Sequence, residues 1–168
     1  MSEFMEINPK EISENAMKLI GTDWMLVAAG NKEKANAMTA SWGGVGIMWG
    51  YDVAYIVIRP QRYTKTFIDN NTTLSLSFFD DSFKEQLKYF GSVSGKDEDK
   101  ITKTGMTLAY DGETPYFNDA KLVLVCEKLF AQDFDKESFI DKSLIEKWYP
   151  NEDYHTMYIA KITKALIK

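Results

Sequence analysis

The chain contains few of the residues that most often carry chemistry. Among its 168 residues there is one cysteine, Cys126, and one histidine, His155. A single cysteine excludes an internal disulfide, and one cysteine with one histidine excludes a Cys/His zinc cluster. No segment approaches the roughly 18 consecutive apolar residues of a membrane-spanning helix, and no basic stretch followed by an apolar run opens the chain. We therefore expect a cytoplasmic protein without a metal site.

Positive charge is also in short supply. The formal net charge is -5 and the isoelectric point is near 5.0. This balance argues against nucleic acid or an anionic membrane as the main partner, because neither would meet a sequence-wide basic surface. The length and the 45% hydrophobic content suffice for one substantial core, so we expect one domain over residues 1–168. An anionic ligand would need positive charge concentrated at one place.

Arginine supplies such a place. The chain has only two arginines, Arg59 and Arg62, in the segment Arg59-Pro-Gln-Arg62-Tyr-Thr-Lys65. A guanidinium can bind a phosphate through two parallel charge-assisted hydrogen bonds, which an ammonium cannot do. Thr64 is a good N-cap for a short helix over 65–71, and a helix N-terminus offers free N–H groups to an anion. Arg62, Thr64 and Lys65 are thus predicted to cradle a phosphate, although surface ion pairs at a strand end explain the spacing equally well.

Hydrophobic patterning predicts strands joined by short helices. Residues 73–78 alternate strictly, with leucines and Phe78 on one side and serines on the other, which is typical of a half-buried strand. Capping boxes at residues 8–11 and 82–85 predict two helices, the first ending at Gly21 and the second at Gly91. A further helical turn should end at Gly105. The other predicted strands cover residues 24–29, 37–42, 53–59, 121–131 and 155–167, with a hairpin loop at 30–34.

This order of elements indicates the fold class. Long βαβ repeats are absent, so the pattern favours a mainly β fold, an antiparallel barrel decorated by short helices, over a doubly wound sheet. The glycine-rich segment Gly43-Gly-Val-Gly46 is not a dinucleotide-binding loop, because Trp49 stands where the third glycine would be and no helix follows. These glycines predict a tight turn that brings backbone close to something flat, and an ordinary hairpin corner is an equal alternative.

Three other features are candidates for a functional site. In Asn36-Ala-Met-Thr-Ala-Ser-Trp42, the hydroxyls of Thr39 and Ser41 could satisfy the polar edge of a heterocycle, although an ordinary strand has the same composition. His155 is the acid/base candidate, since only an imidazole has an ordinary pKa near neutrality, and a structural histidine fits equally. The acidic run 97–99 reads as a solvated face or as a helix cap that turns Ser94 and Lys100 toward an anion. Cys126, inside an apolar strand, should pack as a small hydrophobe.

Three segments in this order resemble the flavin reductase-like FMN-binding split-barrel proteins, and in particular their flavoredoxin-like branch. They are Asn36-Ala-Met-Thr-Ala-Ser-Trp-Gly-Gly44, Arg59-Pro-Gln-Arg-Tyr-Thr64 and Gly91-Ser-Val-Ser-Gly-Lys-Asp-Glu-Asp-Lys100. The likeness extends over nearly the whole chain, including residues 115–117, 121–133 and 154–155. It implies an antiparallel split β-barrel with Greek-key-like connectivity.

The resemblance also implies a function and a set of site residues. It implies a homodimer that binds FMN noncovalently near the subunit interface and passes electrons from NAD(P)H to a flavin, a ferric complex or a protein. His155 matches loosely a histidine that lies near the flavin in the family. The implied cofactor-binding residues are Asn36, Met38, Thr39, Ala40, Ser41, Trp42, Arg59, Arg62, Thr64, Ser94 and Lys100. Two alternatives stay open, a module that stores FMN without turnover and an enzyme similar to pyridoxamine phosphate oxidase.

Overall fold

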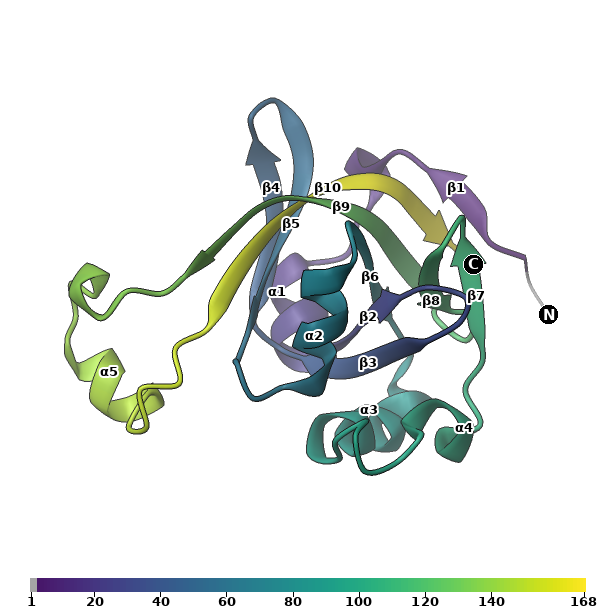
Figure 1. Cartoon of the computed structure of the whole chain (residues 1–168). Helices are drawn as coiled ribbons and strands as arrows, with labels where there is room; N and C mark the ends of the chain where they lie inside the picture. The colour runs from purple at the N-terminus through teal and green to yellow at the C-terminus, as the bar shows by residue number, and fades with distance from the viewer. Residues whose placement is uncertain (1–2) are drawn as a thin grey trace.

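A curved antiparallel sheet forms most of the molecule (Figure 1). The structure is a computed structural model and describes residues 3–168. Its strands follow the order β3-β2-β6-β9-β10-β5-β4, and β1 pairs with β10. A separate hairpin joins β7 to β8. The strands are β1 (Met5–Ile7), β2 (Met25–Gly30), β3 (Ala35–Ala40), β4 (Gly43–Met48), β5 (Tyr51–Ile58), β6 (Thr73–Phe78), β7 (Leu108–Asp111), β8 (Thr114–Phe117), β9 (Leu122–Asp133) and β10 (Thr156–Ile167).

Short helices connect and cover these strands. Helices α2 and α3 pack on β2 and β3, and α4 follows α3 along the same side (Figure 1). The helices are α1 (Ala16–Lys18), α2 (Tyr63–Asn70), α3 (Lys84–Ser92), α4 (Lys100–Thr104) and α5 (Ser143–Trp148), with single 3-10 turns at Pro9–Glu11, Asp81–Phe83 and Lys136–Ser138 and a π turn at Leu19–Asp23. No helix in residues 3–168 is long and apolar enough to cross a membrane.

The sheet closes into a barrel that is split between β3 and β4. These two strands are consecutive in the chain, yet they form the two ends of the hydrogen-bonded strand order. Neighbouring strands in this order pair antiparallel. Several of the paired strands, such as β2 with β6 and β5 with β10, are far apart in sequence. The predicted mainly β antiparallel architecture with short helices is confirmed.

Two apolar cores hold this barrel together. One fills its interior and includes Met25, Leu76 and Ile162, while the other lies outside the sheet under α3 and the β7–β8 hairpin and includes Phe90 and Phe117. Strand β2 and the first half of β9 contribute side chains to both cores, and β6 contributes leucines and Phe78 to the inner core while its serines are buried on the other face, so all three are buried on both faces there. Cys126 belongs to the inner core, as predicted, and its complete burial raises the pKa of its thiol to about 12.

The prediction of a half-buried β6 was wrong for this reason. Ser75 and Ser77 have no exposed surface, because the β7–β8 hairpin covers the face that the serines occupy. The Ser75 hydroxyl donates to the Pro115 carbonyl at 2.6 Å, and the Ser77 hydroxyl accepts from the Phe117 N–H at 3.3 Å. The alternating pattern shows which residues of the strand are apolar. It does not show that a hairpin about forty residues later in the chain covers the serines and forms hydrogen bonds with their hydroxyls.

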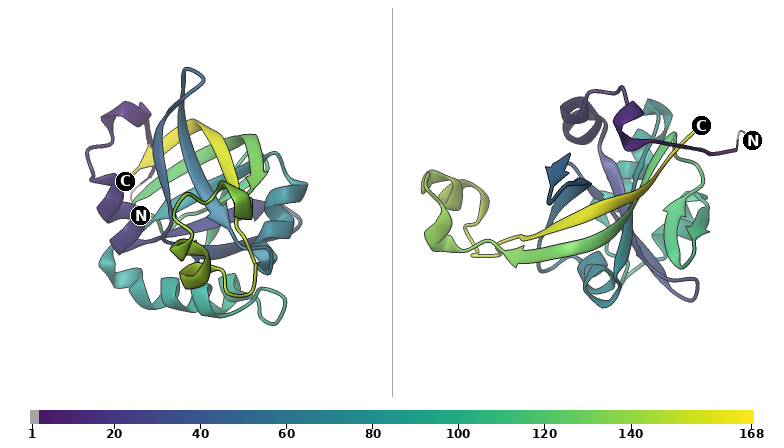
Figure 2. Two further views of the ribbon diagram at one scale, coloured as in Figure 1. Left: turned by 90° about the vertical axis from the view of Figure 1, so that its left-hand side faces the viewer. Right: turned by 90° about the horizontal axis from the view of Figure 1, so that it is seen from above.

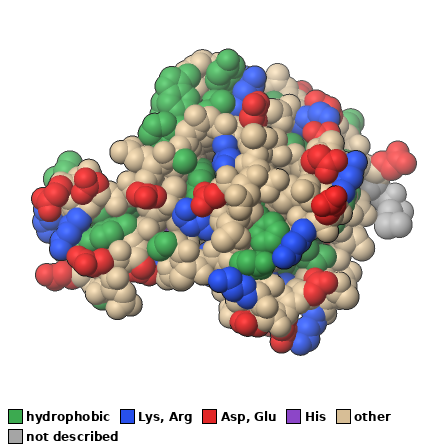
Figure 3. Space-filling view, in the orientation of Figure 1, with side chains coloured by type: hydrophobic (Ala, Val, Ile, Leu, Met, Phe, Trp, Pro, Cys, Tyr) green, Lys and Arg blue, Asp and Glu red, His purple; other side chains and the backbone are tan. Residues whose placement is uncertain are grey.

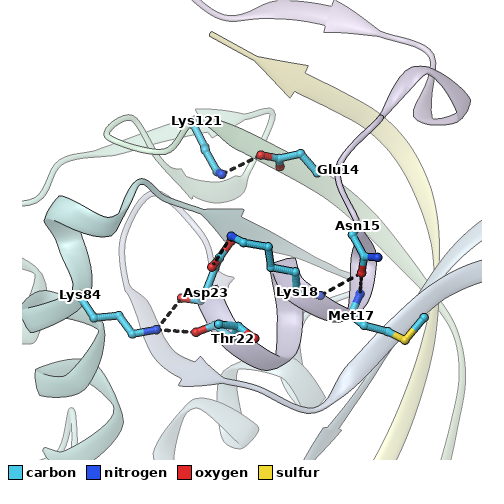
Figure 4. A network of polar contacts seen from close by, with 8 residues as sticks. All are labelled: Glu14, Asn15, Met17, Lys18, Thr22, Asp23, Lys84 and Lys121. Carbon is cyan, nitrogen blue, oxygen red and sulfur yellow. Dashed lines mark hydrogen bonds and ion pairs between the residues drawn. The ribbon is translucent and has the colours of Figure 1, made fainter.

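The N-terminal segment differs from the predicted continuous helix. The capping box forms as predicted, since Asn8 and Glu11 bond each other's backbone, but it opens only one 3-10 turn. Asn15 then caps a second start by accepting from the backbone of Met17 and Lys18 (Figure 4). Asparagine side chains compete in this way with helical backbone bonds, so the segment breaks before Ala16.

Long polar side chains fasten this segment to the barrel (Figure 4). Lys84 at the start of α3 donates to the carbonyls of Thr22 and Asp23, and Lys121 pairs with Glu14. These bonds therefore hold Glu14, Thr22 and Asp23 of the N-terminal segment against one end of the barrel.

Two other local predictions need correction. The chain does not use the capping box at Ser82, because a 3-10 turn precedes α3 and no side chain caps that helix; α3 runs through Gly91 to Ser92. The glycines at 43–46 form strand β4 and not a tight turn. A Cβ on Gly44 would lie 2.4 Å from the ring of Tyr55 on β5, so the flat group that the backbone approaches is this protein's own phenol.

Strands β9 and β10 run beyond the barrel and carry an arm, which we define as residues 134–155. The arm includes α5 and projects from one side of the barrel (Figures 1 and 2). Sequence analysis predicted neither α5 nor the β7–β8 hairpin nor β1.

The buried serine bond provides a test of this packing. Replacing Ser75 with alanine should lower the free energy of unfolding by about 1–2 kcal/mol, the scale of one buried hydrogen bond. Urea denaturation measures this change. Ser138→Ala, on an exposed turn, is the control and should change stability little; an equal effect of the two substitutions would contradict the assignment.

Candidate functional site

Two adjoining cavities lie where β3, the start of α2 and the end of α3 meet. The first, of about 150 Å³, is called the basic cavity here. The second, of about 290 Å³, is called the aromatic cavity. Arg62 lines both. The predicted residues Asn36, Thr64, Ser94 and Lys100 line the basic cavity, and Met38, Thr39, Ala40, Ser41, Trp42, Arg59 and His155 line the aromatic cavity.

Arg62 and Lys100 place two cations side by side in the basic cavity. Lys100 is only 3% exposed. Burial and the nearby charge of Arg62 lower the pKa of Lys100 to about 8, and burial lowers the pKa of Arg62. Neither side chain has a carboxylate within 4.0 Å in residues 3–168. A buried and a half-buried cation that lie together without a counter-ion in the described residues favour the binding of an anion.

The C-terminal end of α3 holds both cations. The Lys100 Nζ donates to the Phe90 carbonyl at 3.0 Å, and the Arg62 Nη1 donates to the Gly91 carbonyl at 3.1 Å. The last carbonyls of a helix lack partners within the helix and carry partial negative charge, so they attract cations. This arrangement positions the cations and leaves most of their donor hydrogens free for a ligand.

The polar wall of the basic cavity depends on Asn36. Its Nδ2 donates to the Thr64 Oγ1 at 2.9 Å, so Thr64 faces Asn36 and does not cap α2. The predicted N-cap role of Thr64 was therefore wrong, and Arg62 occupies the cap position. A Cβ on Gly95 would lie 2.2 Å from the Asn36 Oδ1, so glycine lets the loop at 95 press against this amide.

Lys65, predicted for the phosphate cradle, and Asp99, of the acidic run, make other contacts and do not line the basic cavity. Lys65 pairs with Asp69 along α2 at 2.7 Å and does not line the basic cavity. Asp99 caps α4 by accepting from the Thr102 N–H at 3.1 Å, as the acidic run allowed, and the Thr102 bonds lower the pKa of Asp99. Ser94 lies in the same loop, where its hydroxyl oxygen accepts from the Lys96 N–H.

Arg59 holds the arm and does not line the basic cavity. Its Nη1 pairs with the Asp153 carboxylate at 2.8 Å, and its Nη2 donates to the Trp148 carbonyl at 2.9 Å. Its guanidinium also lies 5.1 Å from the ring centre of Tyr149. The structure thus separates the two arginines: Arg62 lines both cavities, whereas Arg59 lines only the aromatic cavity.

Aromatic rings from the barrel and the arm form the second cavity. Trp42 meets Trp148 edge to face, with 4.9 Å between ring centres, and lies 5.1 Å from the imidazole of His155. Met38 and Ala40 supply a buried apolar floor. The Thr39 hydroxyl donates to the Leu87 carbonyl of α3, which leaves Ser41 with the free hydroxyl on this strand end. The result is a hollow with flat walls.

His155 is neutral and fixed in orientation. Its Nδ1 lies 2.7 Å from the Tyr149 hydroxyl. Burial and the charge of Arg59 lower the pKa of His155 to about 4, while burial raises the pKa of Tyr149. A protonated phenol can donate or accept, so the tautomer is an assignment: we take the phenol as the donor to Nδ1, which places the imidazole hydrogen on Nε2. In residues 3–168 no partner bonds Nε2, so this N–H is available to a ligand.

Comparison with known proteins identifies the family. The model of the flavin reductase like domain matches residues 17–168. The chain belongs to the flavin reductase-like family. No curated protein sequence matches it.

Solved structures show the same fold for this flavin reductase-like chain. A flavoredoxin from Methanosarcina acetivorans has a TM-score of 0.69 at 19% identity, over 99% of this chain and 76% of that one. An FMN-binding domain of a flavin reductases-like enzyme from Shewanella baltica OS155 has 0.70 at 16%, over 98% and 77%. An NADH:FAD oxidoreductase from Streptomyces globisporus, in complex with NAD and FAD fragments, has 0.65 at 14%, over 88% and 76%. The split-barrel prediction is confirmed.

The residues present fit the flavin phosphate that the family implies. Arg62 and Lys100 supply charge, while Thr64, Ser94 and Asn36 supply polar groups in a cavity of suitable size. The flat aromatic cavity beyond Arg62 fits a ring system. No cluster of three His, Cys, Asp or Glu side chains in residues 3–168 could hold a metal ion.

Sequence analysis missed part of the lining of the basic cavity, and it missed two residues that contact the lining of the aromatic cavity from the arm. Tyr63, Gly91 and Gly95 line the basic cavity, and the glycines lay within a segment already singled out for its likeness to the family. Trp148 and Tyr149 carried no signal, because they are about ninety residues from Arg59 in the chain and reach the site only through the shape of the arm.

The single imidazole allows a direct test of the His155 environment. An NMR titration should give a pKa near 4 and a neutral form protonated at Nε2. As the pH falls from 6.5 to about 4, the unfolded chain binds this proton and the folded chain does not, so stability should fall over that interval and this contribution should level off below it.

Tyr149→Phe should raise the titration midpoint and allow both neutral tautomers, because Nδ1 loses its donor. Tyr154→Phe is the control, since the neighbouring Tyr154 hydroxyl is buried without a partner in the described residues. A Tyr149→Phe protein that titrates like the parent would show that the phenol does not fix the imidazole.

Proposed function

We propose that this protein is an FMN-binding oxidoreductase that passes electrons from NAD(P)H through FMN to a flavin, a ferric complex or a protein. The observation that carries the proposal is the pair of cations, buried Lys100 and half-buried Arg62, which have no carboxylate within 4.0 Å in residues 3–168 and lie beside a flat aromatic cavity. Structural relatives described as a flavoredoxin, an FMN-binding domain and an NADH:FAD oxidoreductase support it.

In this proposal the two cavities divide the cofactor between them. Arg62 and Lys100 bind the phosphate, with Thr64, Ser94 and Asn36 as polar neighbours. Residues Met38–Trp42 and Arg59 border the ring system. Bound FMN would supply the hydride and one-electron chemistry, so the protein needs no nucleophile of its own. The Nε2–H of His155 is the one imidazole donor and would act by donating a hydrogen bond to the ring system or to the bound donor.

Rapid mixing tests whether the protein turns over. Mixing the FMN-loaded protein with NADH or NADPH without oxygen should bleach the flavin absorbance, and adding an acceptor should restore it. A protein that stores FMN without turnover would bind the flavin but leave it oxidised with both nicotinamides. That result would sink the oxidoreductase proposal and keep the binding site.

The role of Arg62 can be measured separately. Arg62→Ala should weaken FMN binding by about 1.5–3 kcal/mol, the scale of a hydrogen bond to a charged group. Arg62→Lys should also lose affinity, because an ammonium cannot form the bidentate fork. Lys65→Ala is the matched control, since Lys65 pairs with Asp69 outside the cavity. Calorimetric titrations that give all three variants the parental affinity would remove Arg62 from the site.

The proposal includes a homodimer and a cytoplasmic location. A patch of exposed apolar side chains covers the β4–β5 hairpin at the top of the molecule (Figure 3). It includes Val45, Ile47, Met48, Trp49, Tyr51 and Tyr55. Contiguous apolar patches of this kind mark protein interfaces. A free buried thiol suits a reducing compartment.

Light scattering tests the dimer. Ile47 is 65% exposed in the patch, and Ile47→Asp should convert a dimer to a monomer that keeps its circular dichroism spectrum. Met5→Asp, at a residue of similar exposure on β1, should leave the dimer intact. A monomeric parent protein, or a dimer that tolerates Ile47→Asp, would exclude this patch as the interface.

A further inference from the structure

A hollow of about 200 Å³ lies at the end of the barrel opposite the arm, and we call it the end cavity. The inner core supplies its floor through Phe78, Leu122, Leu124 and Ile162, each at most 8% exposed. These residues lie at the end of β6, at the start of β9 and past the middle of β10, whereas the arm joins the end of β9 to the start of β10. The end cavity shares no lining residue with the basic or the aromatic cavity.

The N-terminal segment forms a second wall of the end cavity. It crosses the barrel end as short turns, because Asn15 caps a new helix start after the first 3-10 turn. Its lining residues are Pro9, Ile12, Ala16, Leu19 and Ile20. Short turns with small side chains such as Ala16 bridge the barrel end without filling it. They leave a hollow far larger than the voids of an ordinary close-packed interior, few of which exceed one water molecule.

The β4–β5 hairpin forms the third wall and the mouth. Val45 and Ile47 line the end cavity and pair in register with Ala54 and Asp52. Because Ala54 belongs to the inner core, this face of the hairpin is continuous with the barrel interior. Val45 is nevertheless 43% exposed and Ile47 65% exposed. The end cavity therefore opens to solvent between the hairpin and the N-terminal segment.

The charged side chains of this lining already have partners. The Lys10 Nζ donates to both carboxylate oxygens of Asp52 at 2.8 Å, which ties the N-terminal segment to the hairpin. Glu14 pairs with Lys121 at 2.7 Å. Within residues 3–168, Lys10, Glu14 and Asp52 are the charged members of the lining. A charged ligand would find no unpaired counter-charge among them, and burying an unpaired charge among apolar groups is unfavourable. The lining therefore favours an uncharged ligand.

The size of the end cavity defines its ligand further. In another protein, an engineered cavity of about 150 Å³ lined by leucine, isoleucine and phenylalanine stays dry and binds benzene. The end cavity has the same kind of lining and a similar volume. We infer that the end cavity binds one small, uncharged, apolar molecule of the size of a single aromatic ring. This site goes beyond the proposed flavin function and does not depend on it. Binding forms and breaks no covalent bond.

Titrations of the full-length protein with fluorobenzene, followed by fluorine NMR, test this inference. Fluorobenzene should bind saturably at one site per chain, with a dissociation constant of about 1 mM or lower. The charged probe para-fluorobenzoate should bind at least about tenfold more weakly, because its carboxylate finds no free cation in the lining. Bound fluorobenzene should also raise the temperature of unfolding, since it binds the folded chain only.

Variants that fill the hollow locate the bound probe. Ala16→Leu should weaken fluorobenzene binding by at least about tenfold and keep or raise the unfolding temperature of the free protein, because the larger side chain occupies an existing void. Val45→Phe narrows the same hollow from the hairpin and should weaken binding as well, so the test does not rely on α1 tolerating leucine. Ser13→Leu is the matched control, since Ser13 is exposed on the same segment and does not line the end cavity. It should leave the affinity unchanged.

Other occupants and other sites give different results, and each would overturn the inference. Binding that does not saturate, or that Ala16→Leu and Val45→Phe leave unchanged, would place the probe on the exposed apolar surface. Displacement of fluorobenzene by FMN would assign it to the aromatic cavity. Affinity that falls as the protein concentration rises would show that a side chain of a second copy of the chain fills the end cavity instead.

Discussion

The C-terminal end of α3 binds two cations that have no carboxylate within 4.0 Å in the described part of the chain. The carbonyls of Phe90 and Gly91 receive Lys100 and Arg62, and the rest of the candidate site is arranged around this contact. Carbonyl dipoles stabilise a charge less than a carboxylate would, so the cations would keep affinity for the phosphate of the proposed ligand. The outer core positions this end of α3, because Leu87 and Phe90 are buried against the sheet.

The fold was largely predictable because strands of strong apolar character dominate it. The predicted strands near β2, β3, β5, β6, β9 and β10 all exist, and the capping residue Asn8 and the ending at Gly105 were found at the expected places. The failures share a cause. Ser75 looked solvent-facing and Thr64 looked like a cap, and each is bonded by a residue distant in sequence. Local pattern cannot report a partner that only the tertiary fold supplies.

The same distinction separates the predictable and unpredictable parts of the site. The scarcity of arginine pointed to Arg62, and the likeness of three segments to a family pointed to the end of β3 and the loop at 91–100. Sequence spacing suggested one role for both arginines. In the structure Arg59 binds the arm instead, because its guanidinium bonds the Asp153 carboxylate and the Trp148 carbonyl, which both belong to the arm.

The barrel and the arm therefore hold different parts of the candidate site. In the proposed function, affinity for the anion comes from Arg62, Lys100 and the end of α3, all of which lie outside residues 134–155. The environment of His155 depends on Tyr149, Trp148 and Arg59, which the arm supplies or binds. On that proposal, detachment of the arm would leave the phosphate-binding cations in place, while the aromatic cavity would lose one wall and His155 would lose the partner that orients it. Tight binding and tuned reactivity can vary independently in such a chain, since they are encoded in separate stretches of it.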